Sequence, residues 1–349
     1  MMLLEAHDCV SLTEPRPGAP AAAMRAGMRI SSANGATGSH VNRVRADALL
    51  ITITLVWGTS FVIVQGAVSR YGVLSFLALR FGVAALALVP VLRHRQQVRR
   101  ALGPGLLLGL LLFGGFFTQT AGLVYTTPAR SAFITGLCVV LVPVLGIAFG
   151  QRPTGRVWQG VALGLVGLAV LSWGCHLPQL GCATLDAALP HRAFGDLLTL
   201  ACAVVFAGHI LAVAHYSRRH AALPLGAIQI AVVAVLSAAL ASTTERPLAA
   251  PPVAVFWAAV FLGLTATAMN FTLQIALQRH TSATHAALIY SLEPVFAALF
   301  SRLWTGEALT GAVLVGGSVM LAGVILAESS VAEPIDAVAS GRQTVVSAP

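Results

Sequence analysis

The amino-acid sequence predicts an all-α integral membrane protein with ten transmembrane helices, arranged as two inverted repeats of five helices each. Three observations lead to this fold class. The 349 residues are 57% hydrophobic and only 9% charged, whereas soluble domains carry about 25% charged residues. Apolar stretches of about 20 residues, enough to span a bilayer, recur along the chain. The two halves of the sequence also resemble each other.

The composition excludes several other classes of protein. The formal net charge is +9, but the 21 basic residues are all Arg and are spread over short connections. A nucleic-acid-binding protein would instead gather its basic residues in one stripe. Five Cys in so long a chain do not make a secreted disulfide scaffold.

The ends of the chain differ from its middle. Residues 1–45 lack helical apolar periodicity and a long apolar core, so they predict a disordered tail and not a signal peptide. Met24 and Met28 are alternative starts of the chain. Residues 328–349 are polar and acidic, and they predict a second disordered tail.

Between these tails the apolar stretches define the predicted spans. The first repeat covers 46–173, a connecting loop covers 174–194, and the second repeat covers 195–327. The ten predicted spans are 47–68, 73–92, 103–124, 128–149, 155–173, 195–215, 222–241, 253–275, 283–303 and 309–327.

The distribution of Arg predicts the orientation, because cytoplasmic loops carry an excess of basic residues. With the N-terminus inside, fifteen Arg fall on the cytoplasmic side and five on the opposite side, while Arg80 lies within the second span. We therefore expect a multi-pass protein of the plasma or inner membrane with both termini in the cytoplasm.

The internal repeat is most evident in its polar and glycine matches. Spans three and four align with spans eight and nine at an offset of 154, which pairs Gly109 with Gly263. Spans one and two align with six and seven at an offset of 149, which pairs Arg70 with Arg219 and places Arg80 opposite Gln229. Because each unit has an odd number of spans, the second would enter the membrane from the opposite face. Many secondary transporters have this architecture, with their site near the midplane.

Four motifs resemble those of a known family. They are WGTSF at 57–61, LRF at 79–81, TGL at 135–137 followed by VP at 142–143, and SLEPVFAAL at 291–299 followed by GE at 306–307. Together they resemble the drug/metabolite transporter superfamily, in its EamA-like branch of ten-span proteins. The ninth-span motif is the most specific of the four.

The resemblance covers both repeats and implies export or uptake of small metabolites, amino acids or drugs, often coupled to protons. It implies no single substrate. The chain departs from the family in one respect, because Gln151 stands where the first repeat would carry an acid equivalent to Glu307.

Glu293 is the candidate for proton coupling, since it is the one acid near the middle of a span. An ionisable group there costs about 2.5–3.5 kcal/mol on insertion scales, so a functional role is its default interpretation. A neutral Glu that fixes helix packing is the alternative. Pro294 follows it and is expected to kink the helix, as is Pro143 in the fourth span.

Arg80 has three interpretations from the sequence. Its guanidinium could pair with Glu293, bind an anionic group of a substrate, or extend to the lipid headgroups. Other polar or amphipathic residues within the spans are candidates for substrate binding, although each could equally form an interhelical hydrogen bond. These candidates are Trp57, Gln119, Asn270, Gln274 and Tyr290.

Two further features leave alternatives open. Glycines in spans five and ten, including Gly160 and Gly323, suit close helix packing either within a monomer or in a homodimer. Cys175 and Cys182 in the connecting loop are either bridged or free thiols.

The motifs of intramembrane enzymes, such as an aspartate-rich metal motif or H-E-x-x-H, are not found in the sequence. A receptor or structural protein would have no need of an inverted duplication. We therefore expect a non-enzymatic secondary transporter that exports a small solute by alternating access. Its partners would be that solute and the lipid bilayer, with no metal, cofactor or nucleic acid.

Overall fold

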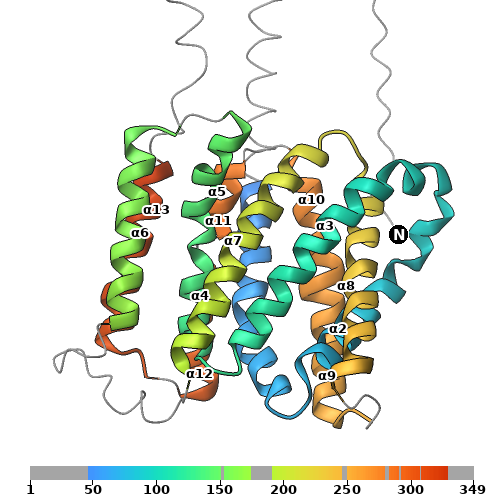
Figure 1. Cartoon of the computed structure of the whole chain (residues 1–349), viewed down its shortest axis with the longest axis horizontal. Coiled ribbons are helices and arrows are strands. Elements are labelled where there is room, and N and C mark those ends of the chain that lie inside the picture. The colour runs from blue at the N-terminus through green and yellow to red at the C-terminus, as the bar shows by residue number, and fades with distance from the viewer. Residues whose placement is uncertain are drawn as a thin grey trace, which may run out of the picture. The chain divides into compact units, whose positions relative to one another are not determined.

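A computed structural model describes residues 46–150, 153–173, 191–245, 250–279, 283–290, 292–306 and 308–328. Within these ranges the regular secondary structure is entirely helical (Figure 1). The two predicted tails, Gln151, the Cys175 and Cys182 loop, Ser291 and Glu307 lie outside the described residues.

In the described part of the chain, seven helices are long and apolar enough to cross a membrane, and each coincides with a predicted span. They are Ala46–Val68, Val73–Arg93, Arg95–Gly122, Pro128–Gly146, Arg192–Tyr216, Ala222–Thr244 and Val253–Gln278. The remaining three predicted spans also contain helix. A fully helical backbone suits a bilayer because each helix satisfies its own N–H and C=O groups.

The first helix is Ala46–Val68. The helices that follow are α2 (Val73–Leu88), α3 (Arg95–Gly122), α4 (Pro128–Gly136), α5 (Cys138–Gly146), α6 (Gly155–Trp173), α7 (Arg192–Tyr216), α8 (Ala222–Thr244), α9 (Val253–Leu262), α10 (Asn270–Gln278), α11 (Ala283–Tyr290), α12 (Glu293–Thr305) and α13 (Gly311–Glu328). The described residues also form the short segments η1 (Val89–Arg93), η2 (Ile147–Phe149) and the π-helical η5 (Gly263–Met269).

The third helix begins at Arg95, before the predicted start at 103. Its first turns are rich in Arg and Gln, so hydropathy does not detect them. They extend the helix on the N-terminal side of the apolar stretch. Pro104 lies inside this helix.

Three of the predicted spans are irregular in the middle. The fourth consists of α4 and α5, separated at Leu137, and the ninth consists of α11 and α12. The eighth runs from α9 through η5 into α10. Pro294 lies in the first turn of α12, where its missing N–H costs no helical hydrogen bond. Pro143 lies inside α5, six residues beyond the interruption at Leu137.

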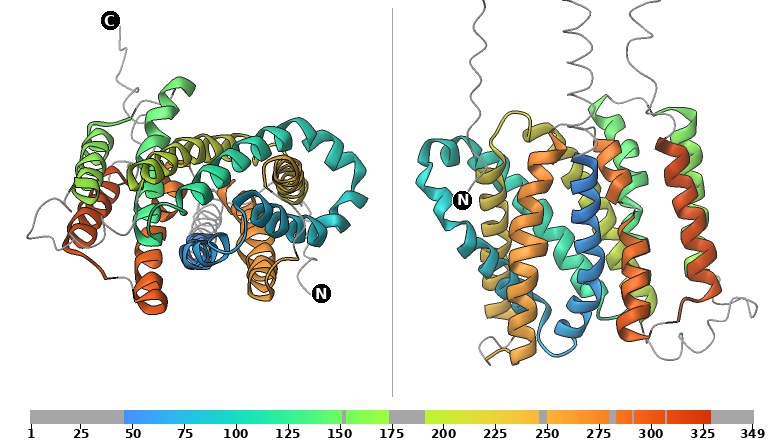
Figure 2. Two further views of the ribbon diagram at one scale, coloured as in Figure 1. Left: turned by 60° about the horizontal axis from the view of Figure 1, so that its bottom comes forward. Right: turned by 180° about the vertical axis from the view of Figure 1, so that it is seen from behind.

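Helices of the first repeat pack against helices of the second. The α2 helix contacts α8, α4 contacts α12, and α6 contacts α13. In Figures 1 and 2, α6 and α13 lie side by side at one edge of the described helices. Glycine makes this approach possible, because a Cβ on Gly323 would lie 2.7 Å from the Gly160 carbonyl oxygen.

Polar contacts join the two repeats at the end of the helices that the Arg distribution predicts to be outside, at the bottom of Figure 1. Arg130 on α4 donates from Nε to Asp196 Oδ1 at 2.8 Å and from Nη2 to Oδ2 at 2.6 Å. Glu245, directly after α8, accepts hydrogen bonds from the amides of Leu74 and Ser75 on α2, each at 2.8 Å. These two contacts tie α4 to α7 and α2 to α8.

Asp196→Asn is expected to destabilise the fold by about 1–2 kcal/mol. Breaking a fully buried pair costs about 3–5 kcal/mol, but the Asp196 side chain is 19% exposed, so solvent reduces the loss. Thermal unfolding of the purified protein measures it, together with Arg130→Gln and the double variant. Strictly additive effects of the two substitutions would show that the pair contributes no coupling energy.

Candidate functional site

A cavity of about 50 Å³ lies among the interrupted helices. Four of the residues that line it come from helix ends: Thr135 and Cys138 on either side of the interruption between α4 and α5, and Tyr290 and Glu293 on either side of the one between α11 and α12. Broken helices of this kind often form the binding sites of transporters. The cavity is therefore the candidate functional site.

The cavity brings together most of the residues that the sequence predicts for a site. Five of the six candidates for substrate binding line it, and so does the candidate for proton coupling. They are Trp57, Arg80, Gln119, Gln274, Tyr290 and Glu293.

Arg80 supplies a buried cation to this cavity. Its side chain is 1% exposed, so it does not extend to the lipid headgroups, and that interpretation is wrong. Its Nε donates to Thr267 Oγ1 at 2.8 Å, and Cζ lies 4.9 Å from the centroid of the Phe116 ring. Among the described residues, Nη2 has no hydrogen-bond partner, and no acidic oxygen lies within the 4.0 Å of an ion pair. One arm of the guanidinium is thus left without an anion.

Glu293 begins α12 and is partly buried at the cavity wall. No hydrogen bond or ion pair joins its carboxylate to any described side chain. The first helix reaches its backbone closely, because a Cβ on Gly58 would lie 3.0 Å from the Glu293 carbonyl oxygen. Its role in proton coupling stays a prediction.

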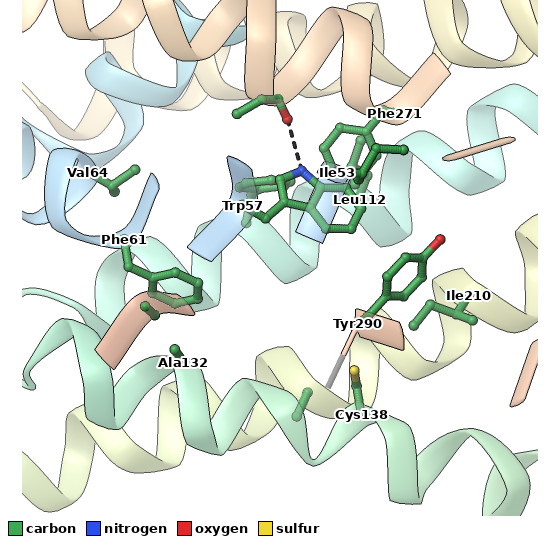
Figure 3. Close-up of a cluster of buried hydrophobic side chains, with 14 of the residues drawn as sticks. Ile53, Trp57, Phe61, Val64, Leu112, Ala132, Cys138, Ile210, Phe271 and Tyr290 are labelled. Atoms are coloured by element: carbon green, nitrogen blue, oxygen red, sulfur yellow. Dashed lines mark hydrogen bonds between the residues drawn. The ribbon is translucent and has the colours of Figure 1, made fainter. Parts of the chain in front are cut away.

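Trp57 is held against the eighth predicted span. Its indole Nε1 donates to the Ala266 carbonyl oxygen at 3.0 Å, drawn as the dashed line in Figure 3. Its ring also lies 5.1 Å from Phe271 and 5.4 Å from Tyr290, measured between centroids. Figure 3 shows these three rings together, and all three residues line the cavity.

The π-helical segment η5 provides the acceptors for the hydrogen bonds of both Trp57 and Arg80. It carries Ala266, which accepts from Trp57, and Thr267, which accepts from Arg80 and donates to the Leu262 carbonyl oxygen at 2.9 Å. A π-turn is frequent at functional sites. A Cβ on Gly263 would lie 2.7 Å from the Arg80 carbonyl oxygen, so glycine is required for α2 to approach this segment.

Three neutral polar side chains complete the wall. Gln119 donates to Thr135 Oγ1 at 3.3 Å. Gln274 donates to Gln278 Oε1 at 3.5 Å, but its own Oε1 has no partner in the described part of the chain. The Tyr290 hydroxyl is likewise buried without a described partner. The Tyr290 hydroxyl lies near the Gln274 side chain, and by geometry neither the hydroxyl nor the Gln274 Oε1 has the hydrogen bond that a bound molecule could supply.

Asn270 does not line the cavity. Its Nδ2 donates to the Ile53 carbonyl oxygen at 3.1 Å, so it joins α10 to the first helix. Sequence spacing alone could not separate it from Gln274, because residues four apart share one face of a helix.

The sequence analysis did not single out several residues of the site. Thr135, Thr267 and the aromatic pair Phe116 and Phe206 were missed. The repeat carries a signal for one of them, since the 149-residue offset places Phe206 opposite Trp57. No sequence signal marks Thr135 or Thr267, because Thr is common within apolar helices.

His209 also lines the cavity, and one of its ring nitrogens, Nε2, lies 2.9 Å from Gln229 Oε1. Within the described ranges, no three His, Cys, Asp or Glu side chains come together as a metal site.

Comparisons with known proteins find one matching family model and several relatives that are named as transporters. The model of the EamA-like transporter family matches residues 44–173 and 193–328. An uncharacterized transporter of Archaeoglobus fulgidus is 32% identical over 300 residues, which cover 85% of this chain and 89% of the relative. The uncharacterized inner membrane transporter YedA of Escherichia coli is 25% identical over 275 residues, covering 75% and 83%.

A solved crystal structure shares the fold. It covers 84% of this chain and 100% of its own, with a TM-score of 0.60 and 23% sequence identity.

Proposed function

Since the chain belongs to the EamA-like transporter family, we propose that this membrane transporter carries a small solute through the cavity by alternating access. The solute would be an amino acid, a drug or a related metabolite. Arg80 would hold its anionic group, and Glu293 would couple its passage to protons.

One observation carries this proposal most directly. The cavity presents a buried guanidinium arm, an amide oxygen and a hydroxyl, none with a hydrogen-bonding partner among the described residues. Buried polar groups are nearly always satisfied, and the exceptions call for an explanation. A polar solute that binds Arg80, Gln274 and Tyr290 would explain these unsatisfied groups. Trp57 and Phe271 would provide apolar walls around it.

The size of the cavity supports a change of shape during transport. A volume of about 50 Å³ holds one or two water molecules, since each takes about 30 Å³. A metabolite needs more room, so the helices around the site would have to separate to admit it and to release it.

Equivalent contacts in the two halves support an inverted repeat, which would allow the protein to change its shape during transport. A Cβ on Gly109 would meet Val232, and a Cβ on Gly263 would meet Val83; these are the same contact once the repeat offsets are applied. The interruptions correspond as well, because the offset of 154 maps Leu137 onto residue 291, between α11 and α12. Two such halves could exchange an inward-open and an outward-open arrangement.

The direction of transport is proposed to be export, with both termini in the cytoplasm. The test is a solute screen in cells that lack their own exporters, with and without this protein. We expect intracellular accumulation of at least one amino acid or drug to fall when the protein is present. If no solute in the panel changes its accumulation in either direction, while the protein is present in the membrane, the proposal fails.

A further inference from the structure

The turn between α7 and α8 lines a shallow cavity of about 410 Å³ at the predicted cytoplasmic end. Arg218, Arg219 and His220 come from this turn, and Arg279 comes from the end of α10. Positive charge is expected in cytoplasmic loops, but that rule does not require two separate connections to converge on one cavity.

Ser217 gives the cavity a buried polar group. The residue is 2% exposed and belongs to the cavity wall. Its hydroxyl has no hydrogen-bonding partner within the described ranges. An unsatisfied buried hydroxyl in a cavity that three Arg residues also line is a donor available to an anion.

The N-terminus of α8 opens onto the same place. Its N-cap residue, Ala221, lines the cavity and provides no side-chain hydrogen bond, and the first turn of α8 contains no acidic residue. A helix N-terminus carries partial positive charge and attracts anions.

The first repeat contains the equivalent helix end, and there an anion is already bound. The 149-residue offset aligns the start of α8 with the start of α2, pairing Leu223 with Leu74. At α2 the Glu245 carboxylate accepts from the Leu74 and Ser75 amides and from the Ser75 hydroxyl. At α8 no acidic side chain of the described residues lines the cavity.

The two ends also differ in how an anion could be held. Pro224 stands where α2 has Ser75, so α8 lacks one of the amides and the hydroxyl that bind Glu245. Guanidinium groups and the Ser217 hydroxyl take their place. Several guanidinium donors around one point suit a group with several acceptor oxygens, such as a phosphate, better than a single carboxylate.

We propose that Ser217, Arg218, Arg219 and Arg279 form a binding site for a phosphate group at the cytoplasmic turn between α7 and α8. Two sources share this chemistry: the headgroup of an anionic phospholipid, as in basic pockets at the cytoplasmic face of other membrane proteins, and a free phosphate compound. The site is separate from the central cavity and does not depend on the solute that is transported.

The test uses the purified full-length protein in detergent and has two arms. In one, inorganic phosphate is titrated while the melting temperature is followed, with chloride at equal ionic strength as the reference. In the other, native mass spectrometry counts bound phosphatidylglycerol and phosphatidylcholine. Arg219→Gln and Ser217→Ala are the test variants. Arg70→Gln is the matched control, because it removes the same charge at the repeat-equivalent position.

We expect Arg219→Gln to weaken binding about tenfold, or about 1.4 kcal/mol, Ser217→Ala to weaken it less, and Arg70→Gln to leave it unchanged. Binding in the lipid arm or the phosphate arm identifies the source, and either result supports the site. The proposal is overturned if the wild-type protein binds in neither arm, or if Arg70→Gln weakens binding as much as Arg219→Gln does.

Discussion

The Arg80→Gln variant is expected to lose transport and at the same time to gain thermal stability. The Arg80 guanidinium is buried without an acidic partner in the described part of the chain, and placing Arg within a span costs about 2.5–3.5 kcal/mol. Gln removes that cost, and the second repeat already accommodates Gln229 in the equivalent buried position. Removing one member of a buried charged contact to a ligand costs about 2–5 kcal/mol, so solute flux should fall at least about 30-fold.

Two measurements on the same preparation test this expectation. Solute uptake into proteoliposomes gives the transport rate, and thermal unfolding gives the stability. Arg302→Gln serves as the matched control because it removes an exposed Arg from the far end of α12, and both quantities should stay at wild-type values. Normal transport by Arg80→Gln would refute a contact between Arg80 and the solute.

Glu293→Gln is expected to abolish proton-driven flux while leaving expression and folding intact. The carboxylate faces the cavity without a hydrogen bond from any described residue, so the amide of Gln breaks no native contact and fits the same space. It cannot take up and release a proton, so the driving force of an imposed pH gradient should no longer reach the solute. Flux in proteoliposomes, with and without that gradient, measures the effect.

The conservative variant separates coupling from packing. Glu293→Asp keeps a titratable carboxylate on a shorter side chain, so it should retain a dependence on the pH gradient even if the rate falls. A proton ionophore should abolish the gradient effect in both wild-type protein and Glu293→Asp. A pH-gradient response in Glu293→Gln equal to that of the wild type would assign Glu293 to packing alone.

The positions of the helices could be predicted because a bilayer requires long apolar segments with satisfied backbones. Hydropathy therefore located the seven long spans closely. It could not locate the start of α3, since the helix already begins at Arg95, in the polar segment that precedes the apolar stretch. Nor could it reveal η5, because Gly263–Met269 differs from a regular helix in its hydrogen bonding and not in its composition.

The candidate site was predictable to the extent that rare polar residues within apolar spans are informative. Arg80 and Glu293 were identified in this way, and both line one cavity. The partners of each side chain were not predictable, because they depend on which helix faces meet. Thr267 reaches Arg80 only through η5, and Asn270 is directed to Ile53 by the packing of α10 on the first helix.

The contacts of Arg130 with Asp196 and of Glu245 with α2 both join the two repeats at the same end of the molecule. A carrier that opens at that end would have to part both contacts in a single step. Dissolved salt weakens the attraction between charges near water. A higher ionic strength on that side would therefore favour the arrangement in which these two contacts are broken. The speed of the transport cycle would then depend on the salt on that side of the membrane, even for a solute that bears no charge.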